Sequence, residues 1–193
     1  MSSDGVRNRI VVISGPSGVG KSTITRQVVE QMDEVHLSVS ATTREKSESE
    51  VEGKDYWFIS RDEFEKRIEQ GRFLEYAKVF DNYYGTPVEE LEKTREDGDV
   101  LLLEIDVQGG KKVKDKYPET VMIFILAPSE KDLAKRLNNR GRDAEHDVEK
   151  RLNGASNEIA AAWQYYDHMV INDELSQAVD EVKNIIKDNT GDK

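Results

Sequence analysis

The stretch that decides the fold of this chain is Gly15-Pro16-Ser17-Gly18-Val19-Gly20-Lys21-Ser22. It matches the pattern G-x-x-x-x-G-K-[ST], in which glycines let backbone N–H groups turn inward around phosphate oxygens. A short β-branched run at residues 10–13 precedes it, and a helical pattern over about 21–32 follows it. The motif thus stands between a buried strand and a helix N-terminus, where the helix dipole favours an anion.

Two side chains of this motif add chemistry of their own. Lys21 can reach the β- and γ-oxygens of a bound nucleotide, and the Ser22 hydroxyl can ligate Mg²⁺. The alternative is a glycine-rich turn that matches by chance. The motif lies between a strand and a helix, which is where a phosphate-binding loop has to lie. This position argues against a chance match.

Strands and helices alternate along most of the chain, which is typical of an α/β fold with a parallel sheet. Asp106 follows one of the strands, at the end where such sheets bind ligands. Its carboxylate either orients a magnesium-bound water or caps the next segment. Further strands are predicted at 35–39, 100–103, 121–126 and 169–171, and helices at about 88–97, 130–139, 147–165 and 174–188.

Two segments interrupt the alternation. Residues 40–86 combine strand and helix signals and form an α+β insertion large enough to be a lobe of its own. Residues 138–150 are rich in arginine and lack a clear apolar period. The elements expected in the first insertion are a strand at 55–59, a helix from the capping box of Ser60 and Glu63 to about Gly71, and a hairpin joining 73–80 to 83–84.

The composition excludes several classes of protein. The 193 residues predict one globular unit. With 28 Lys+Arg against 39 Asp+Glu the net charge is −11, which disfavours binding to nucleic acid or to an anionic membrane. The absence of cysteine excludes disulfides and thiolate metal sites. The sequence has neither a membrane-spanning run nor a signal peptide, so we expect a cytoplasmic protein.

Five blocks of the sequence resemble the guanylate kinase family, in the family's order and spacing. Together they are far more specific than the phosphate-binding motif alone, and the resemblance covers roughly residues 9–186. The blocks are SGPSGVGKST from Ser14 to Thr23, SVSATTR ending at Arg44, GKDY ending at Tyr56, NYYGT ending at Thr86, and EIDVQG from Glu104.

The resemblance implies a nucleoside monophosphate kinase that converts ATP and GMP, and also dGMP, with Mg²⁺ as cofactor. It implies an α/β P-loop kinase core with a parallel five-stranded sheet flanked by helices, acting as a monomer or homodimer. The core would comprise residues 9–39, 87–137 and 151–188, the GMP-binding lobe residues 40–86, and a short helical lid residues 138–150.

The same resemblance assigns residues to each substrate. Those for ATP are the stretch from Gly15 to Ser22, Thr23 and Arg136, with Ser22 on the metal. Those for GMP are Ser40, Arg44, Tyr56, Glu75, Tyr84, Thr86, Glu104 and Asp106. Those expected to act in catalysis are Lys21, Arg44, Arg140 and Arg151.

The chemistry of these residue types fits the assignment. Arg44, Tyr56 and Tyr84 offer a guanidinium fork and two phenols to a phosphate. The guanine edge presents N1–H and N2–H donors, which a carboxylate such as Glu75 accepts and which adenine lacks. No general base is needed, because the attacking GMP phosphate has a second pKa of about 6 and is mostly deprotonated at neutral pH.

The sequence departs from the family pattern after Arg44. The family usually has a proline, a second arginine and a glycine there, and this chain has Ser47 in place of that arginine, with Lys46 before it. A lysine lacks the bidentate fork, so we expect weaker GMP binding with the same base preference. Glu48 and Glu50 add negative charge that the pattern does not explain.

Two other functions remain open from the residues. One is a kinase of the same fold with a different acceptor. The other is a catalytically weak guanylate-kinase-like module that binds phosphorylated peptides, which would have a degraded phosphate-binding motif. The intact Lys21 and Ser22 disfavour the second alternative.

Overall fold

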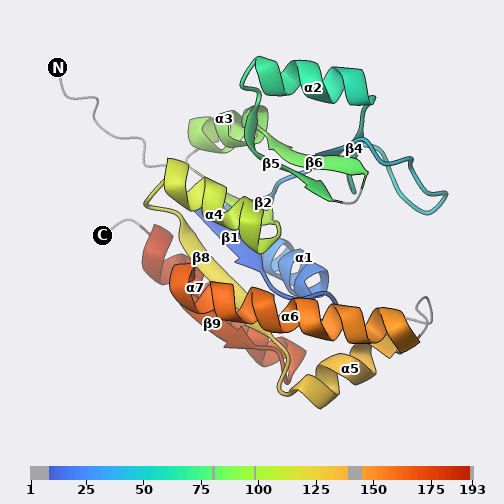
Figure 1. Cartoon of the computed structure of the whole chain (residues 1–193). Coiled ribbons are helices and arrows are strands. Elements are labelled where there is room, and N and C mark those ends of the chain that lie inside the picture. The colour runs from blue at the N-terminus through green and yellow to red at the C-terminus, as the bar shows by residue number, and fades with distance from the viewer. Residues whose placement is uncertain (1–8, 80, 98, 139–144, 192–193) are drawn as a thin grey trace.

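The computed structural model describes residues 9–79, 81–97, 99–138 and 145–191 and contains two sheets (Figure 1). The central sheet has five parallel strands in the order β2-β7-β1-β8-β9, which confirms the predicted core. Its strands are β1 (Ile10–Ser14), β2 (Val35–Leu37), β7 (Val100–Glu104), β8 (Val121–Leu126) and β9 (His168–Ile171).

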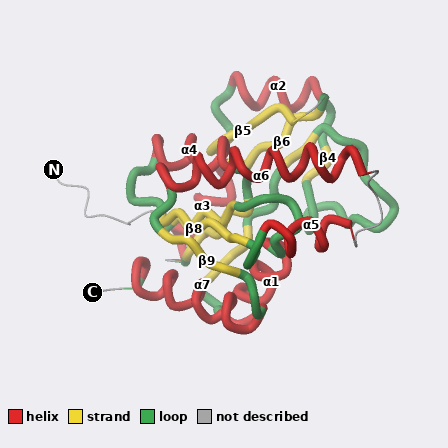
Figure 2. The backbone as a smooth tube through the Cα atoms, turned by 60° about the horizontal axis from the view of Figure 1, so that its bottom comes forward, coloured by secondary structure: helices red, strands yellow, loops and turns green. Residues whose placement is uncertain are grey.

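Helices cover both faces of this sheet because its strands are apolar on both sides. Val11 and Ile13 of β1 pack in one cluster with α1 (Lys21–Gln31) and α7 (Leu175–Thr190). Ile10 and Val12 pack in a second cluster with α3 (Val88–Asp97) and α4 (Val107–Lys116). Figure 2 shows α1 and α7 on one side of the sheet and α4 on the other. The alternating strand residues therefore fix which helices lie on which face.

Helix α4 is an element that the sequence analysis does not predict. Its sequence, VQGGKKVKDK, has two glycines and a single fully buried aliphatic residue, Val113, so it carries little helical periodicity. The helix begins at Asp106, whose Oδ1 accepts a hydrogen bond of 2.8 Å from the Gly109 N–H. An N-cap and the packing of one valine are what hold this segment helical.

The second sheet forms the expected lobe, which lies above the central sheet in Figure 1. The Ser60 half of the predicted capping box is present, since Ser60 Oγ accepts a hydrogen bond of 3.2 Å from the Glu63 N–H, whereas Glu63 Oε1 accepts from Arg67 Nε at 2.7 Å. The rings of Phe64 and Phe73 stack with centroids 4.3 Å apart in the lobe core. The elements are β3 (Ala41–Thr42), β4 (Trp57–Phe58), α2 (Arg61–Glu69) and the hairpin of β5 (Phe73–Val79) and β6 (Asn82–Pro87), in sheet order β4-β3-β6-β5.

The arginine-rich segment lies between α5 (Glu130–Asn138) and α6 (Glu145–Tyr165). Of the expected lid, residues 139–144 fall outside the described residues, and residues 145–150 form the first turns of α6. Figure 2 shows α6 as one long helix that passes from α5 to α4. The expected boundary between lid and core at residue 150 therefore falls inside a continuous helix. In the described part of the chain, no helix is both long and apolar enough to span a bilayer.

Candidate active site

The phosphate-binding loop lies between β1 and α1, as the sequence predicts. Gly20 has φ 98°, and a Cβ there would lie 2.5 Å from Asn172 Nδ2, so only glycine fits. The Lys21 Nζ folds over the loop and donates to the carbonyls of Gly15 and Pro16 at 2.6 and 3.0 Å. None of the residues described in the first turn of α1 is acidic. The helix dipole and the lysine thus face the same anion position.

Ser22 and Thr25 of α1 are tied to Glu104 at the end of β7. Ser22 Oγ donates to Glu104 Oε1 at 2.6 Å, and Thr25 Oγ1 donates to Oε2 at 3.0 Å. The sequence analysis expects Glu104 beside the base, whereas both of its oxygens meet α1. A hydroxyl and a carboxylate side by side are the ligand types that Mg²⁺ prefers beside nucleotide phosphates. This pair therefore fits a bound magnesium ion.

Arg136 and Asn172 clamp the far side of the loop. Asn172 Nδ2 donates to the Val19 carbonyl at 2.7 Å, and Arg136 Nη2 donates to the Asn172 carbonyl at 2.8 Å. Asn172 is 6% exposed and belongs to the site although no motif singled it out. Its place directly after β9, at the same sheet edge as the loop, is the signal that could have identified it.

Glu75 and Thr86 form a buried pair across the lobe hairpin. They are register partners on β5 and β6, and Glu75 is 6% exposed. Glu75 Oε1 accepts from the Thr86 N–H at 3.1 Å and from Thr86 Oγ1 at 2.9 Å. Burial raises the pKa of the Glu75 carboxyl, and the bonds from Thr86 oppose that rise. A carboxylate oriented in this way can accept hydrogen bonds from a base edge.

Arg44, Tyr56 and Tyr84 come together in the same lobe. The guanidinium carbon of Arg44 lies 5.6 Å from the centre of the Tyr56 ring, and the Tyr56 and Tyr84 rings meet edge to face at 5.9 Å. Burial raises the pKa of the Tyr56 phenol, so the phenol keeps its proton and remains a donor. Ser40 lies at the start of the lobe, where its carbonyl accepts from the Trp57 N–H at 2.9 Å.

The contacts of Glu50 account for one of the two acidic residues that the family pattern left unexplained after Arg44. Its carboxylate accepts from Arg44 Nη2 at 2.6 Å and Nη1 at 3.1 Å, and from Ser47 N and Oγ at 2.8 and 2.7 Å. The Arg44 hydrogen bond, then those of Ser47, lower the pKa of Glu50 to about 2. Ser47, which replaces the expected second arginine, therefore serves as a donor to the partner of Arg44.

The remaining assigned residues are placed as follows. Asp106 caps α4, so of its two expected roles the capping one is present in the structure. Arg151 lies within α6, and Arg140 lies outside the described residues.

A hydroxyl relay that no sequence pattern indicated joins Tyr166, the residue after α6, to Ser14 at the end of β1. Tyr166 Oη donates to Ser14 Oγ at 2.6 Å, and Ser14 Oγ donates to the Ile105 carbonyl at 2.6 Å. Burial raises the pKa of Tyr166, which keeps the phenol neutral. The relay connects the residue before Gly15 with the residue before Asp106.

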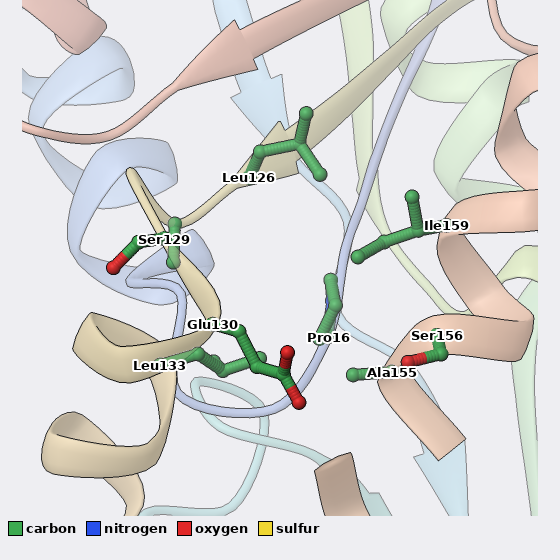
Figure 3. Close-up of a pocket in the computed structure, with 9 residues that line it drawn as sticks. Pro16, Leu126, Ser129, Glu130, Leu133, Ala155, Ser156 and Ile159 are labelled. Carbon is green, nitrogen blue, oxygen red and sulfur yellow. The ribbon is translucent and has the colours of Figure 1, made fainter. Parts of the chain in front are cut away.

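A small cavity of about 180 Å³ lies beside Pro16 (Figure 3). Its walls come from the end of β8, the start of α5 and the middle of α6. Leu126, Leu133 and Ile159 make most of it apolar, and the Glu130 carboxylate points across it toward Pro16. Small-molecule sites usually measure roughly 300–1,000 Å³. The cavity is thus smaller than a typical site for a whole small molecule, and its apolar walls and the Glu130 carboxylate disfavour a nucleotide phosphate.

Comparisons with known proteins agree with this geometry. A family model described as guanylate kinase matches residues 7–189. A guanylate kinase of Caldanaerobacter subterraneus subsp. tengcongensis is 47% identical over 92% of this chain and 85% of its own length. One from Clostridioides difficile is 44% identical over 92% and 86%.

A solved structure leads to the same family. The crystal structure of guanylate kinase from Anaplasma phagocytophilum superimposes with a TM-score of 0.78 at 34% identity, covering 97% of this chain and 88% of that one. The phosphate loop, the buried carboxylate of the lobe and these likenesses lead to one conclusion: the chain belongs to the guanylate kinase family.

Proposed function

We propose that this protein transfers the γ-phosphoryl group of ATP to GMP, giving ADP and GDP. The observation that carries the proposal is the buried Glu75 carboxylate, which has one oxygen fixed by Thr86 and stands in a lobe separate from the phosphate loop. Guanine offers two adjacent donors to such an acceptor. Adenine offers none at that edge, so a site built on this carboxylate rejects it.

ATP binds in the loop from Gly15 to Ser22, next to Thr23. The backbone amides and the dipole of α1 hold its phosphates, and Lys21 reaches the transferred group. Arg136 and Asn172 fix the Val19 carbonyl and so the shape of the loop that holds ATP.

Mg²⁺ is held by Ser22 with Glu104 beside it, and when bound it neutralises charge on the ATP phosphates. We assign Glu104 to this role instead of to the base, because both its oxygens face α1 hydroxyls.

GMP binds between the lobe and the core. Arg44, Tyr56 and Tyr84 grip its phosphate, and Glu75, Thr86 and Ser40 face its base. Asp106, which caps α4, contributes to this site from the core side, and its negative charge adds to the raised pKa of the Glu75 carboxyl. The residues named here bind the phosphate and the base of GMP. Since dGMP has the same phosphate and the same base, it serves as a second acceptor.

The phosphoryl transfer itself needs positioning and charge stabilisation and no protein nucleophile. Arg140, from the lid of residues 138–150, and Arg151, within α6, neutralise the equatorial oxygens of the transferred group. ATP and GMP are metabolites of the cell interior, which supports action in the cytoplasm.

A coupled assay of ADP release with GMP, AMP, CMP and UMP tests the proposal. We expect GMP to be converted with a kcat/KM about 10⁴-fold above that for AMP, since unpaired polar groups reject the wrong base. Preferred conversion of another monophosphate would support a kinase with a different acceptor. Binding of GMP without turnover of any nucleotide would support the non-catalytic module.

A further inference from the structure

Gly109, the third residue of α4, packs against the carboxylate of Glu75. It is buried, and a Cβ built on it would lie 2.9 Å from Glu75 Oε2 and 3.4 Å from Glu75 Cδ. Real Cβ atoms essentially never show a contact under 3.0 Å, so an added Cβ forces a shift. Gly109 has ordinary helical backbone angles, so its conformation does not demand glycine. What demands glycine here is the space that the carboxylate occupies.

The Glu75 carboxylate has little freedom to avoid an added methyl group. Its Oε1 is held by two donors of Thr86, at 3.1 and 2.9 Å, and the residue is 6% exposed. Ile105 Cδ1 would also lie 3.4 Å from the same Cβ, so the methyl position is crowded by a second side chain. An added Cβ therefore displaces Oε2, the oxygen that Thr86 does not engage.

We infer that Gly109 is a specificity-determining positioning residue, which sets where Glu75 Oε2 lies and hence how well guanine is accepted. The inference rests on the proposed function, in which that carboxylate accepts the guanine N1–H and N2–H donors. Gly109 does not touch the base in this account and acts only through Glu75. A displacement of a few tenths of an ångström lengthens two hydrogen bonds at once, and such bonds weaken steeply with poor geometry.

If Gly109 has this role, replacing it should weaken GMP recognition without destabilising the fold. Alanine favours a helix more than glycine does, and the N–H of residue 109 keeps its bond to Asp106 after the change. The atoms that must move are the end of a side chain and not backbone. Gly109→Ala should therefore keep or raise the melting temperature while it weakens the use of GMP.

The test is steady-state kinetics of Gly109→Ala with GMP and with ATP. We expect kcat/KM for GMP to fall at least tenfold, mainly through KM, with KM for ATP unchanged. Gly154→Ala in α6 is the matched control, because among the side chains that the structure describes a Cβ there meets nothing within 4 Å. The control has the same change in helix propensity and should leave KM for GMP within twofold of the wild type.

A double-mutant cycle with Glu75→Ala shows whether Gly109 acts through Glu75. Without the carboxylate there is nothing to displace, so adding Gly109→Ala should not change KM for GMP further. A wild-type KM for GMP in Gly109→Ala, or an equal loss in both backgrounds, overturns the inference. If Gly109→Ala fails to fold, Glu75→Ala/Gly109→Ala must still fold, and failure of both also overturns it. Lack of GMP conversion by the wild type would instead overturn the proposed function.

Discussion

The guanidinium of Arg44 and the carboxylate of Glu50 are joined by two hydrogen bonds, of 2.6 and 3.1 Å, within the lobe. This pairing raises the pKa of Arg44 and lowers that of Glu50. Arg44 is thereby held in a fixed orientation over Tyr56 before any phosphate arrives. The same pairing partly neutralises the charge of Arg44. Its guanidinium is therefore well placed, but it attracts a phosphate dianion less strongly than an unpaired guanidinium would.

The first prediction concerns Ser47, where a second cation is missing. Ser47→Arg should lower KM for GMP about fivefold to tenfold, because an added charge-assisted bond to phosphate contributes on the order of 1 kcal/mol. Ser47→Ala is the control, since it removes a hydroxyl bond to Glu50 but keeps the backbone N–H bond. It should change KM for GMP less than twofold. An unchanged KM in Ser47→Arg would mean that Lys46 or another group already serves the phosphate.

The second prediction is that the Glu75 carboxylate lowers the stability of the fold at neutral pH although GMP recognition depends on it. Burial raises the folded-state pKa of this carboxyl above its ordinary value of 4.5. The unfolded chain therefore ionises first, and folding loses stability as the pH rises above about 4.5 until the folded-state pKa is passed. Glu75→Gln has no such cost, so it should melt at a higher temperature than the wild type at pH 7 and at an equal one below pH 4.

The same variant should lose the use of GMP. An amide can accept only one of the two guanine donors and presents its own donors to the other, so kcat/KM for GMP should fall about a hundredfold. Glu65→Gln, at an exposed glutamate of α2, should change neither quantity. A lower melting temperature at pH 7 for Glu75→Gln would contradict the burial argument, and unchanged kinetics would remove Glu75 from base selection.

The third prediction concerns Lys21. Lys21→Met should lower kcat by about 10³-fold, because a cation on the transferred group is lost while the loop amides remain. GMP binding, measured by calorimetry, should stay within twofold, since the lobe residues are untouched. Wild-type turnover in this variant would show that Lys21 takes no part in transfer.

The fourth prediction separates the two hydroxyls on Glu104. Ser22→Ala should raise the magnesium concentration needed for half-maximal rate and lower kcat, because it removes the metal-side hydroxyl. Thr25→Val removes the other hydroxyl, which bonds Oε2, and should leave the magnesium dependence nearly unchanged. Rates measured across a magnesium titration at fixed ATP compare the two. Equal shifts in both variants would argue that Glu104 is a purely structural anchor for α1.

Much of the fold could be predicted because its signals are local. The strands of the central sheet are continuous apolar runs, and the phosphate motif lies between one of them and a helix. Helix α4 lacked such a signal, since its two glycines and four lysines hide a helix that depends on the Asp106 cap and on Val113. The need for glycine at positions 109 and 110 comes from the side chains that pack against them, and these are known only from the folded structure.

The sequence named residue types for the candidate site, but not the contacts that they make. Glu75, Thr86, Arg44 and the loop could be named from motifs. The partner Glu50 could not, because it is defined by a contact that only the folded chain creates, whereas the place of Asn172 directly after β9 was a signal that no motif had singled out. Glu104 shows the same limit. Its place at the end of a strand was clear from the sequence, but the two hydroxyls that it meets lie 82 and 79 positions earlier in the chain.

The most direct test is a competition in one tube, with equal GMP and AMP, magnesium and limiting ATP labelled on its γ-phosphate. If backbone amides beside Lys21 hold the donor and a buried carboxylate selects the acceptor, nearly all of the label should appear in GDP, in step with the ADP released. Label accumulating in the β-position of ADP made from AMP, or in free phosphate with GMP untouched, would contradict the account.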